Sequence, residues 1–268
     1  MIMNILHLSD IHFRRDYQPA QGGYKGMLAK MQSPLIPLFS CLKRIQAQRT
    51  IDLVIISGDL TEDGEVADYA YLKQSLKELV GSTPTIVTLG NHDIKANFRV
   101  GWLGIEPADE PYNEVHLLTD FAIISFDSSI YGVADGKIGD SQFTWLQEAF
   151  QQTQGKPVIF VTHHHLLQQQ HAIPPLPEAE RLLSFLKKQN ILAILNGHTH
   201  FHYTGLAAEK AYFTVDSMSF CGIDEGAGMV RFEERYGYNL YTIVEGKLTQ
   251  QSSETFLPGK FLEKVNMK

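Results

Sequence analysis

Cysteine is scarce in this sequence. The 268 residues include two cysteines, Cys41 and Cys221, which stand far apart along the chain. A disulfide framework needs several cysteine pairs and a cysteine-based zinc site needs clustered thiolates, so both are excluded. The chemistry of the chain must rest on other side chains, and a reducing, cytoplasmic setting is the expected localisation.

Long apolar runs are absent too. No stretch approaches the ~20 apolar residues that cross a bilayer. The apolar opening, residues 1–8, is too short for a signal peptide and lacks the basic segment that begins one. We therefore expect no membrane partner.

Positive charge is in deficit. Lysine and arginine total 23 against 30 aspartates and glutamates, which gives a net charge of -7. A protein that grips a phosphate backbone broadly carries an excess of basic residues. The balance argues against a nucleic-acid partner but leaves room for a local basic pocket. Composition does not fix the oligomeric state, so a homo-oligomer is also allowed.

The chain does contain short apolar runs rich in isoleucine, valine and leucine, and helical patterns lie between several of them. Such runs predict strands buried on both faces. Alternation of strands and helices predicts an α/β fold. The predicted strands are residues 2–8, 51–56, 84–89, 121–126, 157–162 and 191–195. Helical spacing is found over 35–45, 66–79, 143–150 and 179–186, and Asp140 or Ser141 is the expected N-cap of the third helix.

The pattern changes beyond Tyr212. Segments 213–215, 230–232, 239–244 and 247–255 are strand-like, with glycine-containing breaks and no long helix between them. We expect antiparallel strands that complete a second sheet. Because no linker composition appears anywhere, residues 1–268 are expected to form a single domain.

Polar motifs follow five of the predicted strands. In open α/β sheets ligands gather at the carboxyl ends of strands, so these motifs are expected to meet in space. They supply carboxylate, amide and imidazole donors, the mixture that holds borderline divalent metals. The motifs are Asp10-Ile11-His12, Gly58-Asp59, Gly90-Asn91-His92-Asp93, His163-His164-His165 and Gly197-His198-Thr199-His200.

The first two motifs are carboxylate-rich. Asp10 and His12 stand two residues apart, so in extended backbone both point to one side and can address one ion. Asp59 follows a glycine that permits a sharp turn, and its two oxygens can bridge two cations. Each motif alone also fits a turn aspartate or a surface histidine, so the interpretation rests on the whole set.

The other three motifs are rich in histidine. Asn91 offers a neutral amide oxygen, and His92 is open to two interpretations, as a metal ligand or as a free acid. Three consecutive histidines are hard to place in a core because each carries nitrogens that need partners. His163, the first residue after the strand, is the predicted ligand, and His164 is the alternative. Alternation along the strand predicts that these two face different ways. His198 and His200 form a second pair spaced by two residues.

Taken together, the five blocks resemble the calcineurin-like metallophosphoesterase superfamily, whose order they follow across about the first three quarters of the chain. The segments Leu8-Ser9-Asp10-Ile11-His12 and Ser57-Gly58-Asp59-Leu60-Thr61 are similar to its class III cyclic-nucleotide phosphodiesterase and glycerophosphodiesterase branch. Asp127-Ser128, Gly136-Lys137-Ile138-Gly139 and Gln142-x-x-Trp145-Leu146 also fit that branch. One departure is that Leu166 and Leu167 follow the triplet, where this branch often carries prolines.

The resemblance implies a four-layer αββα sandwich, in which helices flank two mixed sheets and the metal site lies at strand carboxyl ends. It implies two divalent cations, drawn from Mn, Fe, Zn and Co. One would be held by Asp10, His12 and His200, the other by Asn91, His163 and His198, with Asp59 as the bridge. His92 would be the catalytic residue beside the phosphate, and Asn91 would also contact the substrate.

The expected activity is hydrolysis of a phosphate ester by a metal-bound hydroxide, with His92 stabilising the phosphoryl oxygens or protonating the leaving alkoxide. The expected substrate is a small phosphodiester, either a cyclic nucleotide or a glycerophosphodiester. A phosphomonoesterase or a nuclease of the same superfamily is the alternative. A non-catalytic scaffold is a further alternative, against which the complete set of motif residues argues.

Three other segments are expected near the substrate. Arg14 and Arg15 follow His12 and could grip a phosphate as a fork, although two such arginines also fit a solvated edge. Residues 16–30 and 168–177 are predicted to be loops that border the site.

Overall fold

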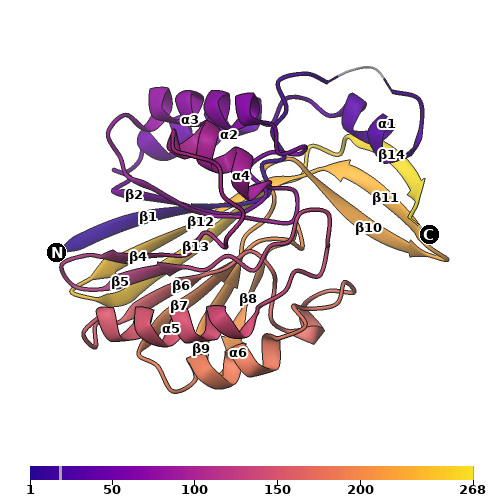
Figure 1. Ribbon diagram of the computed structural model, residues 1–268. Helices are drawn as coiled ribbons and strands as arrows, with labels where there is room; N and C mark the ends of the chain where they lie inside the picture. The colour runs from indigo at the N-terminus through magenta and orange to yellow at the C-terminus, as the bar shows by residue number, and fades with distance from the viewer. Residues whose placement is uncertain (18–19, 268) are drawn as a thin grey trace.

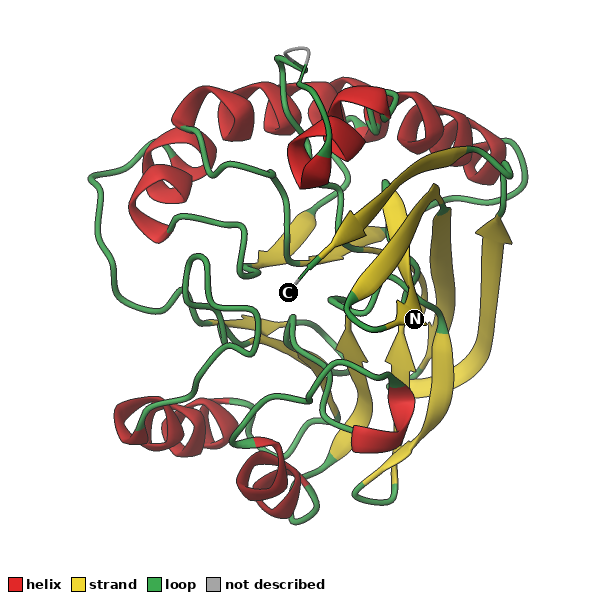
Figure 2. Ribbon diagram, turned by 90° about the vertical axis from the view of Figure 1, so that its right-hand side faces the viewer, coloured by secondary structure: helices red, strands yellow, loops and turns green. Residues whose placement is uncertain are grey.

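Two large β-sheets pack face to face between two layers of helices, as Figures 1 and 2 show. The computed structural model describes residues 1–17 and 20–267. Helices α2 (Leu35–Gln46) and α3 (Val66–Val80) cover the outer face of the first sheet, and α5 (Asp140–Gln152) and α6 (Ala179–Leu186) cover that of the second. The predicted four-layer αββα sandwich is confirmed.

The first sheet is mixed and has the order β13-β12-β1-β2-β3. Its parallel part consists of β1 (Ile2–Leu8), β2 (Leu53–Ser57) and β3 (Thr85–Thr88). β12 (Tyr236–Val244) runs antiparallel beside β1, and β13 (Lys247–Phe256) pairs with β12. Strands from both ends of the chain therefore share one sheet.

The second sheet is also mixed and has the order β4-β5-β6-β7-β9-β8. Parallel pairing joins β5, β6, β7 and β9, and the edge strands β4 and β8 run antiparallel. The bounds are β4 (Glu114–Leu117), β5 (Ala122–Ser125), β6 (Val158–Val161), β7 (Ile191–Asn196), β8 (Tyr203–Ala207) and β9 (Lys210–Thr214).

Alternation along the strands divides the apolar residues among three layers of core. Successive side chains point to opposite faces, so Ile5 packs between the two sheets and Leu6 packs beneath α2 and α3. In the second sheet Ile159 faces the first sheet while Phe160 packs against α5 and α6. Each such buried side chain contributes about 1.5–3 kcal/mol. Burial on both faces explains why the strands appear in the sequence as continuous apolar runs.

A third, three-stranded sheet lies to one side, at the right of Figure 1. It consists of β10 (Phe220–Gly226), β11 (Met229–Glu234) and β14 (Phe261–Asn266), in the order β10-β11-β14. Helix α1 (Gly23–Lys30) packs on it through a small core of Met27, Leu28, Met31, Phe220, Phe232, Leu262 and Val265. We call these three strands and α1 the side sheet.

The side sheet corrects two expectations. The strand-like segments after Tyr212 do not complete one second sheet, because β9, β11 and β12 each belong to a different sheet. Segment 16–30 is not all loop, since α1 begins at Gly23 with apolar residues for the side sheet; residues 18 and 19 lie outside the described residues.

The remaining elements are short. They are α4 (Lys95–Phe98), a π-helical turn (Arg99–Leu103) and a 3-10 turn (Gln168–Gln170). Helix α5 begins at Asp140 with Gly139 as its N-cap, so neither predicted N-cap, Asp140 or Ser141, is correct. The reason is that the Gly139 N–H donates to Gln142 Oε1 at 3.2 Å. Among the described residues, no helix is both long and apolar enough to cross a bilayer.

Candidate metal centre

The five polar motifs meet at one edge of the two large sheets. Each follows a parallel strand, namely β1, β2, β3, β6 or β7, and parallel strands present their carboxyl ends at the same edge. The ring nitrogens His12 Nε2 and His200 Nε2 lie 3.1 Å apart, although 188 residues separate them in the sequence. The predicted convergence is therefore present in the structure.

The backbone at this edge is unusually strained. Five of the seven predicted ligands have positive φ angles, namely Asp10 (51°), His12 (48°), Asp59 (48°), His198 (70°) and His200 (61°). Non-glycine residues in this left-handed region are uncommon and cluster at functional sites. The sharp turns place each side chain over the strand end, and they are held by hydrogen bonds from Asp10 N to Gly58 O (3.1 Å) and from His12 N to Asp59 O (3.0 Å).

Two glycines are required for this close approach. A Cβ at Gly90 would collide with the Asp59 carboxylate, and one at Gly197 would collide with Ser9 and Asp10. The glycines in these motifs therefore let neighbouring strand ends pack against the acidic side chains.

Asp10, His12 and His200 form the first group of donors. Their ligand atoms all lie within 4.8 Å of one another, and His200 Nε2 is 3.4 Å from Asp10 Oδ1. The other ring nitrogen of His200 contacts Phe220 O at 2.6 Å, which fixes the orientation of the imidazole. Burial lowers the pKa of His200, but the adjacent Asp10 charge outweighs it, so the pKa is raised. Cation binding here would displace the proton.

Asp59 lies between the first group and the second. Its Oδ2 is 3.5 Å from His12 Nε2 and 3.4 Å from His163 Nε2. Burial would raise the pKa of Asp59, yet the neighbouring histidines hold it well below the usual value. The carboxylate is thus ionised and placed where both groups can reach it, as a bridging ligand must be.

The second group contains His163, His164 and His198, whose ligand atoms lie within 4.8 Å of one another. His163 Nδ1 contacts Ser57 O at 2.8 Å and His164 Nδ1 contacts Ser128 Oγ at 2.7 Å. The expectation that these two imidazoles face different ways is wrong. The chain bends at both residues once β6 has ended, so strand alternation no longer applies.

Several buried polar atoms at these strand ends have no hydrogen-bond partner, among them one ring nitrogen of each histidine in the second group. They include Asn91 Oδ1, His163 Nε2, His164 Nε2 and His198 Nε2. A buried unpaired donor or acceptor costs free energy, so such atoms are rare in folded proteins. Burial holds the pKa of His198 and of His164 well below the usual value, which keeps these imidazoles neutral with free lone pairs. Neutral nitrogens and an amide oxygen fit a divalent cation.

His92 lies at the open side of the site. Its backbone N–H donates to Asp59 Oδ1 at 2.9 Å, and its Nδ1 contacts Glu62 O at 3.1 Å. The His92 side chain is 27% exposed, whereas that of His12 is 1% exposed. Burial lowers the pKa of His92, but the charges of Asp59 and Glu62 outweigh it and raise the pKa. An accessible imidazole that holds a proton suits contact with an anionic substrate.

Glu62 is a residue that the sequence reasoning missed. Its Oε2 is 2.7 Å from His12 Nδ1, and its Oε1 is 3.5 Å from His92 Nδ1. The buried Glu62 carboxylate thus lies beside both a predicted metal ligand, His12, and the predicted catalytic residue, His92. Nothing in the sequence distinguishes Glu62 from its partly exposed neighbour Asp63, because the role of Glu62 depends on its contacts with His12 and His92.

The two arginines do not form a phosphate fork in this structure. Arg14 Nε pairs with Asp63 Oδ2 at 2.6 Å, and Arg15 Nε pairs with Asp68 Oδ1 at 2.7 Å. Both guanidinium groups are already engaged by carboxylates. The solvated-edge interpretation describes them better, because each pair is partly exposed.

Residues 3–202 match the family model of the calcineurin-like phosphoesterases. The chain therefore belongs to the calcineurin-like phosphoesterase family, whose enzymes are dimetal-dependent, and the predicted enzyme class is confirmed. Among solved structures, a dimetal phosphatase from Danio rerio aligns with a TM-score of 0.60 at 11% identity, covering 95% of this chain and 98% of that one. That likeness shows a shared fold.

Two curated relatives carry more specific names. A probable cyclic nucleotide phosphodiesterase of Rhodococcus erythropolis is 32% identical over 162 residues, which are 59% of this chain and 54% of that protein. A probable glycerophosphodiester phosphodiesterase of Arcobacter nitrofigilis is 28% identical over 211 residues, which are 74% of this chain and 72% of that protein. The first match thus spans about half of the relative's length.

Proposed function

We propose that this chain is a phosphodiesterase that acts on a small metabolite, a cyclic nucleotide or a glycerophosphodiester. The convergence of ionised carboxylates and unpartnered neutral donors at one buried edge carries the proposal. The names of the two relatives support the diester class. Residues 1–268 are proposed to form a single domain, which the direct pairing of β12 with β1 supports.

The residues present fit two divalent cations. Asp10, His12 and His200 would hold one, Asn91, His163 and His198 would hold the other, and Asp59 would bridge them. His164 is an alternative donor to the second cation, given its position beside His163 and His198. Mn, Fe, Zn and Co all suit this donor set. When bound, two such cations neutralise phosphoryl charge and supply hydroxide near neutral pH.

The protein's own residues contribute position and a proton. The Asn91 amide and the His92 imidazole, from adjacent residues after β3, would contact the phosphoryl oxygens. His92 would donate a proton to the departing alkoxide oxygen, because its pKa is raised and Asp59 and Glu62 hold its backbone and ring in place. Burial of the ligands keeps bulk water away from the charged centre.

A cytoplasmic location is proposed as well. Both cysteines are free and buried, and burial raises the pKa of each thiol to about 11. This is the state expected in a reducing compartment.

A metal-reconstituted substrate screen tests the function. The chelated protein is loaded separately with Mn²⁺, Fe²⁺, Zn²⁺ or Co²⁺. It is then assayed on bis-p-nitrophenyl phosphate, p-nitrophenyl phosphate, cyclic AMP and glycerophosphodiesters. We expect kcat/KM for the diesters to exceed that for the monoester by about tenfold or more. A preference for p-nitrophenyl phosphate would establish a phosphomonoesterase instead, and inactivity with every loaded metal would refute the proposal.

A further inference from the structure

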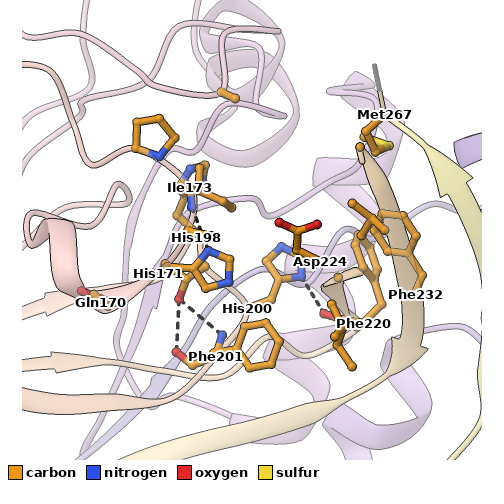
Figure 3. Close-up of a pocket in the computed structure, with 18 of the residues that line it drawn as sticks. Gln170, His171, Ile173, His198, His200, Phe201, Phe220, Asp224, Phe232 and Met267 are labelled. Carbon is orange, nitrogen blue, oxygen red and sulfur yellow. Dashed lines mark hydrogen bonds between the residues drawn. The ribbon is translucent and has the colours of Figure 1, made fainter. Parts of the chain in front are cut away.

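A large cavity opens beside the candidate metal centre, between the side sheet and loop 168–177 (Figure 3). Its volume is about 1160 Å³, which is enough for a drug-sized molecule. His198 and His200 form part of its wall. An ester group attached to a phosphate at the metal centre would therefore extend into this space.

The walls of the cavity are largely apolar. One side is formed by Phe220 and Val230 of the side sheet, together with Met267. Ile173 and Phe201 belong to the other side, as Figure 3 shows. Phe201 is covered by the His171 ring, which stacks on it with 5.4 Å between ring centroids. Such walls favour a bulky apolar or aromatic group and gain little from a small polar one.

Away from the metal-centre histidines, the charged side chains that line the cavity are acidic. Among the described lining residues there is no lysine or arginine, whereas Asp135 and Asp224 are present. Arg235 does lie near Phe201, with its guanidinium 4.8 Å from the ring centroid, but its Nε pairs with Asp216 Oδ1 at 2.5 Å. An additional anionic group on the side of the cavity away from the metal centre would meet carboxylates, with no lysine or arginine among the described lining residues to balance it.

We propose that this cavity is the substrate subsite, and that it selects phosphodiesters whose second ester group is bulky, mainly apolar and free of negative charge. This inference rests on the proposed phosphodiesterase function and states which phosphodiesters the enzyme would prefer. A nucleoside, through its aromatic base, and an aryl alcohol both present a flat ring without negative charge to such walls, and the experiment distinguishes them. A second phosphate on the substrate is disfavoured.

Four p-nitrophenyl diesters test the selection, because they share one leaving group. Their other ester group is methyl, phenyl, thymidine joined through O5′, or the same thymidine carrying a 3′-phosphate. With the Mn²⁺-loaded enzyme we expect the phenyl or thymidine ester to exceed the methyl ester in kcat/KM by about tenfold or more. The 3′-phosphate should lower kcat/KM by about tenfold. The higher kcat/KM of the phenyl and thymidine diesters shows whether the natural ester group is an aryl alcohol or a nucleoside.

Asp224 offers a matched test of the charge effect. Asp224→Asn keeps the acceptor for the Gly226 N–H (2.8 Å) but removes the charge, and Asp224→Lys reverses it. Glu225→Lys is the control, because the Glu225 carboxylate pairs instead with Arg231 (3.1 Å) and Lys264 (2.7 Å) and is not among the lining residues. We expect the 3′-phosphate penalty to shrink to about threefold in Asp224→Asn and to vanish in Asp224→Lys, with no change in Glu225→Lys.

The possible outcomes separate this inference from the proposed function. Hydrolysis of all four diesters at equal kcat/KM, or an equal response of Asp224→Lys and Glu225→Lys, would overturn the subsite and leave the phosphodiesterase intact. Hydrolysis of none of them would refute the phosphodiesterase itself. Lys268 follows the lining residue Met267 and lies outside the described residues, so the wild-type series is repeated with Lys268→Gln, in which we expect the same ranking.

Discussion

The candidate metal centre and the side sheet differ in what holds their side chains in place. At the metal centre the donors are buried except for the partly buried His200, the backbone is left-handed at five ligand positions, and hydrogen bonds from a neighbouring strand end hold the turns at Asp10 and His12. In the side sheet the β10–β11 hairpin is exposed around Gly226, and its charged residues pair with one another at the surface. The comparison indicates that the candidate metal ligands are held rigidly by the large sheets. Under our proposal, substrate selection depends on a less constrained region.

Removal of the bridging carboxylate should have the largest effect. Asp59→Ala takes a ligand from both cations at once, so we expect phosphodiester hydrolysis to fall below detection and both metals to be lost. Metal content after dialysis, measured by mass spectrometry beside kcat, checks this. An Asp59→Ala protein that keeps two metals would show that Asp59 is not the bridge.

Replacement of His92 should separate catalysis from metal binding. His92→Ala is expected to keep both metals but to lose about 10²–10⁴ in kcat, the usual contribution of a general acid. Metal content by mass spectrometry and kcat, measured on the same preparation, distinguish a catalytic role of His92 from a metal-binding one. Loss of metal from His92→Ala would show that His92 is a metal ligand. Its ring lies close enough to His12 and Glu62 to share a cation with them.

Glu62 is expected to have an intermediate effect, because it acts through its neighbours. Glu62→Ala removes the partner of His12 Nδ1 and should weaken metal affinity by about 10–100-fold. Glu62→Gln keeps an oxygen acceptor and should recover much of that loss. Titration of the metal-free proteins with Zn²⁺ gives the affinities without relying on turnover. Asp63→Ala is the control, and an equal loss in that variant would show a nonspecific charge effect.

A core substitution in the side sheet should spare the chemistry. Leu262 is fully buried there, so Leu262→Ala should cost about 2–5 kcal/mol of stability. Hydrolysis of the methyl p-nitrophenyl diester should change by less than about threefold, since that ester barely enters the cavity. Leu186→Ala, equally buried in the second helical layer, is the matched control. If Leu262→Ala lost its metals and Leu186→Ala kept them, the metal centre would depend on the side sheet, contrary to this expectation.

The smallest expected effect concerns stability at low pH. Burial lowers the pKa of His7 to about 3, and His7 contacts Tyr241 Oη at 3.2 Å and Ser57 Oγ at 2.9 Å. As the pH falls, His7 becomes protonated near pH 6.5 in the unfolded chain but only near pH 3 in the folded protein. His7 therefore contributes stability above pH 6.5 that is lost as the pH falls toward 3.

Urea unfolding in EDTA at pH 7.5 and pH 5.0 measures this contribution. The wild type should lose about 2 kcal/mol more than His7→Gln between those pH values. Glutamine keeps hydrogen-bonding capacity without titrating, so it isolates the protonation effect. Equal losses in the two proteins would show that His7 does not control the acid sensitivity.

The large sheets and the metal centre were predictable because their signals are local. A strand buried on both faces must be a continuous apolar run, and the motifs directly follow such runs. Phe213 and Val230 lie in equally strand-like segments yet belong to different sheets, because pairing partners depend on contacts distant in the sequence. The direction of the His164 ring depends on a bend after β6, and the role of Glu62 depends on a packing contact with His12. None of these carries a local signature.

The left-handed turns at His12, His198 and His200 have a consequence for how this protein would evolve in the laboratory. Each such non-glycine conformation costs on the order of 1–3 kcal/mol, which glycine would largely relieve. A library selected for heat resistance alone should enrich glycine at these positions, and its survivors would be sturdier but unable to bind their cations. Selection for thermal tolerance in this fold must therefore be coupled to turnover, or it will remove the activity it was meant to preserve.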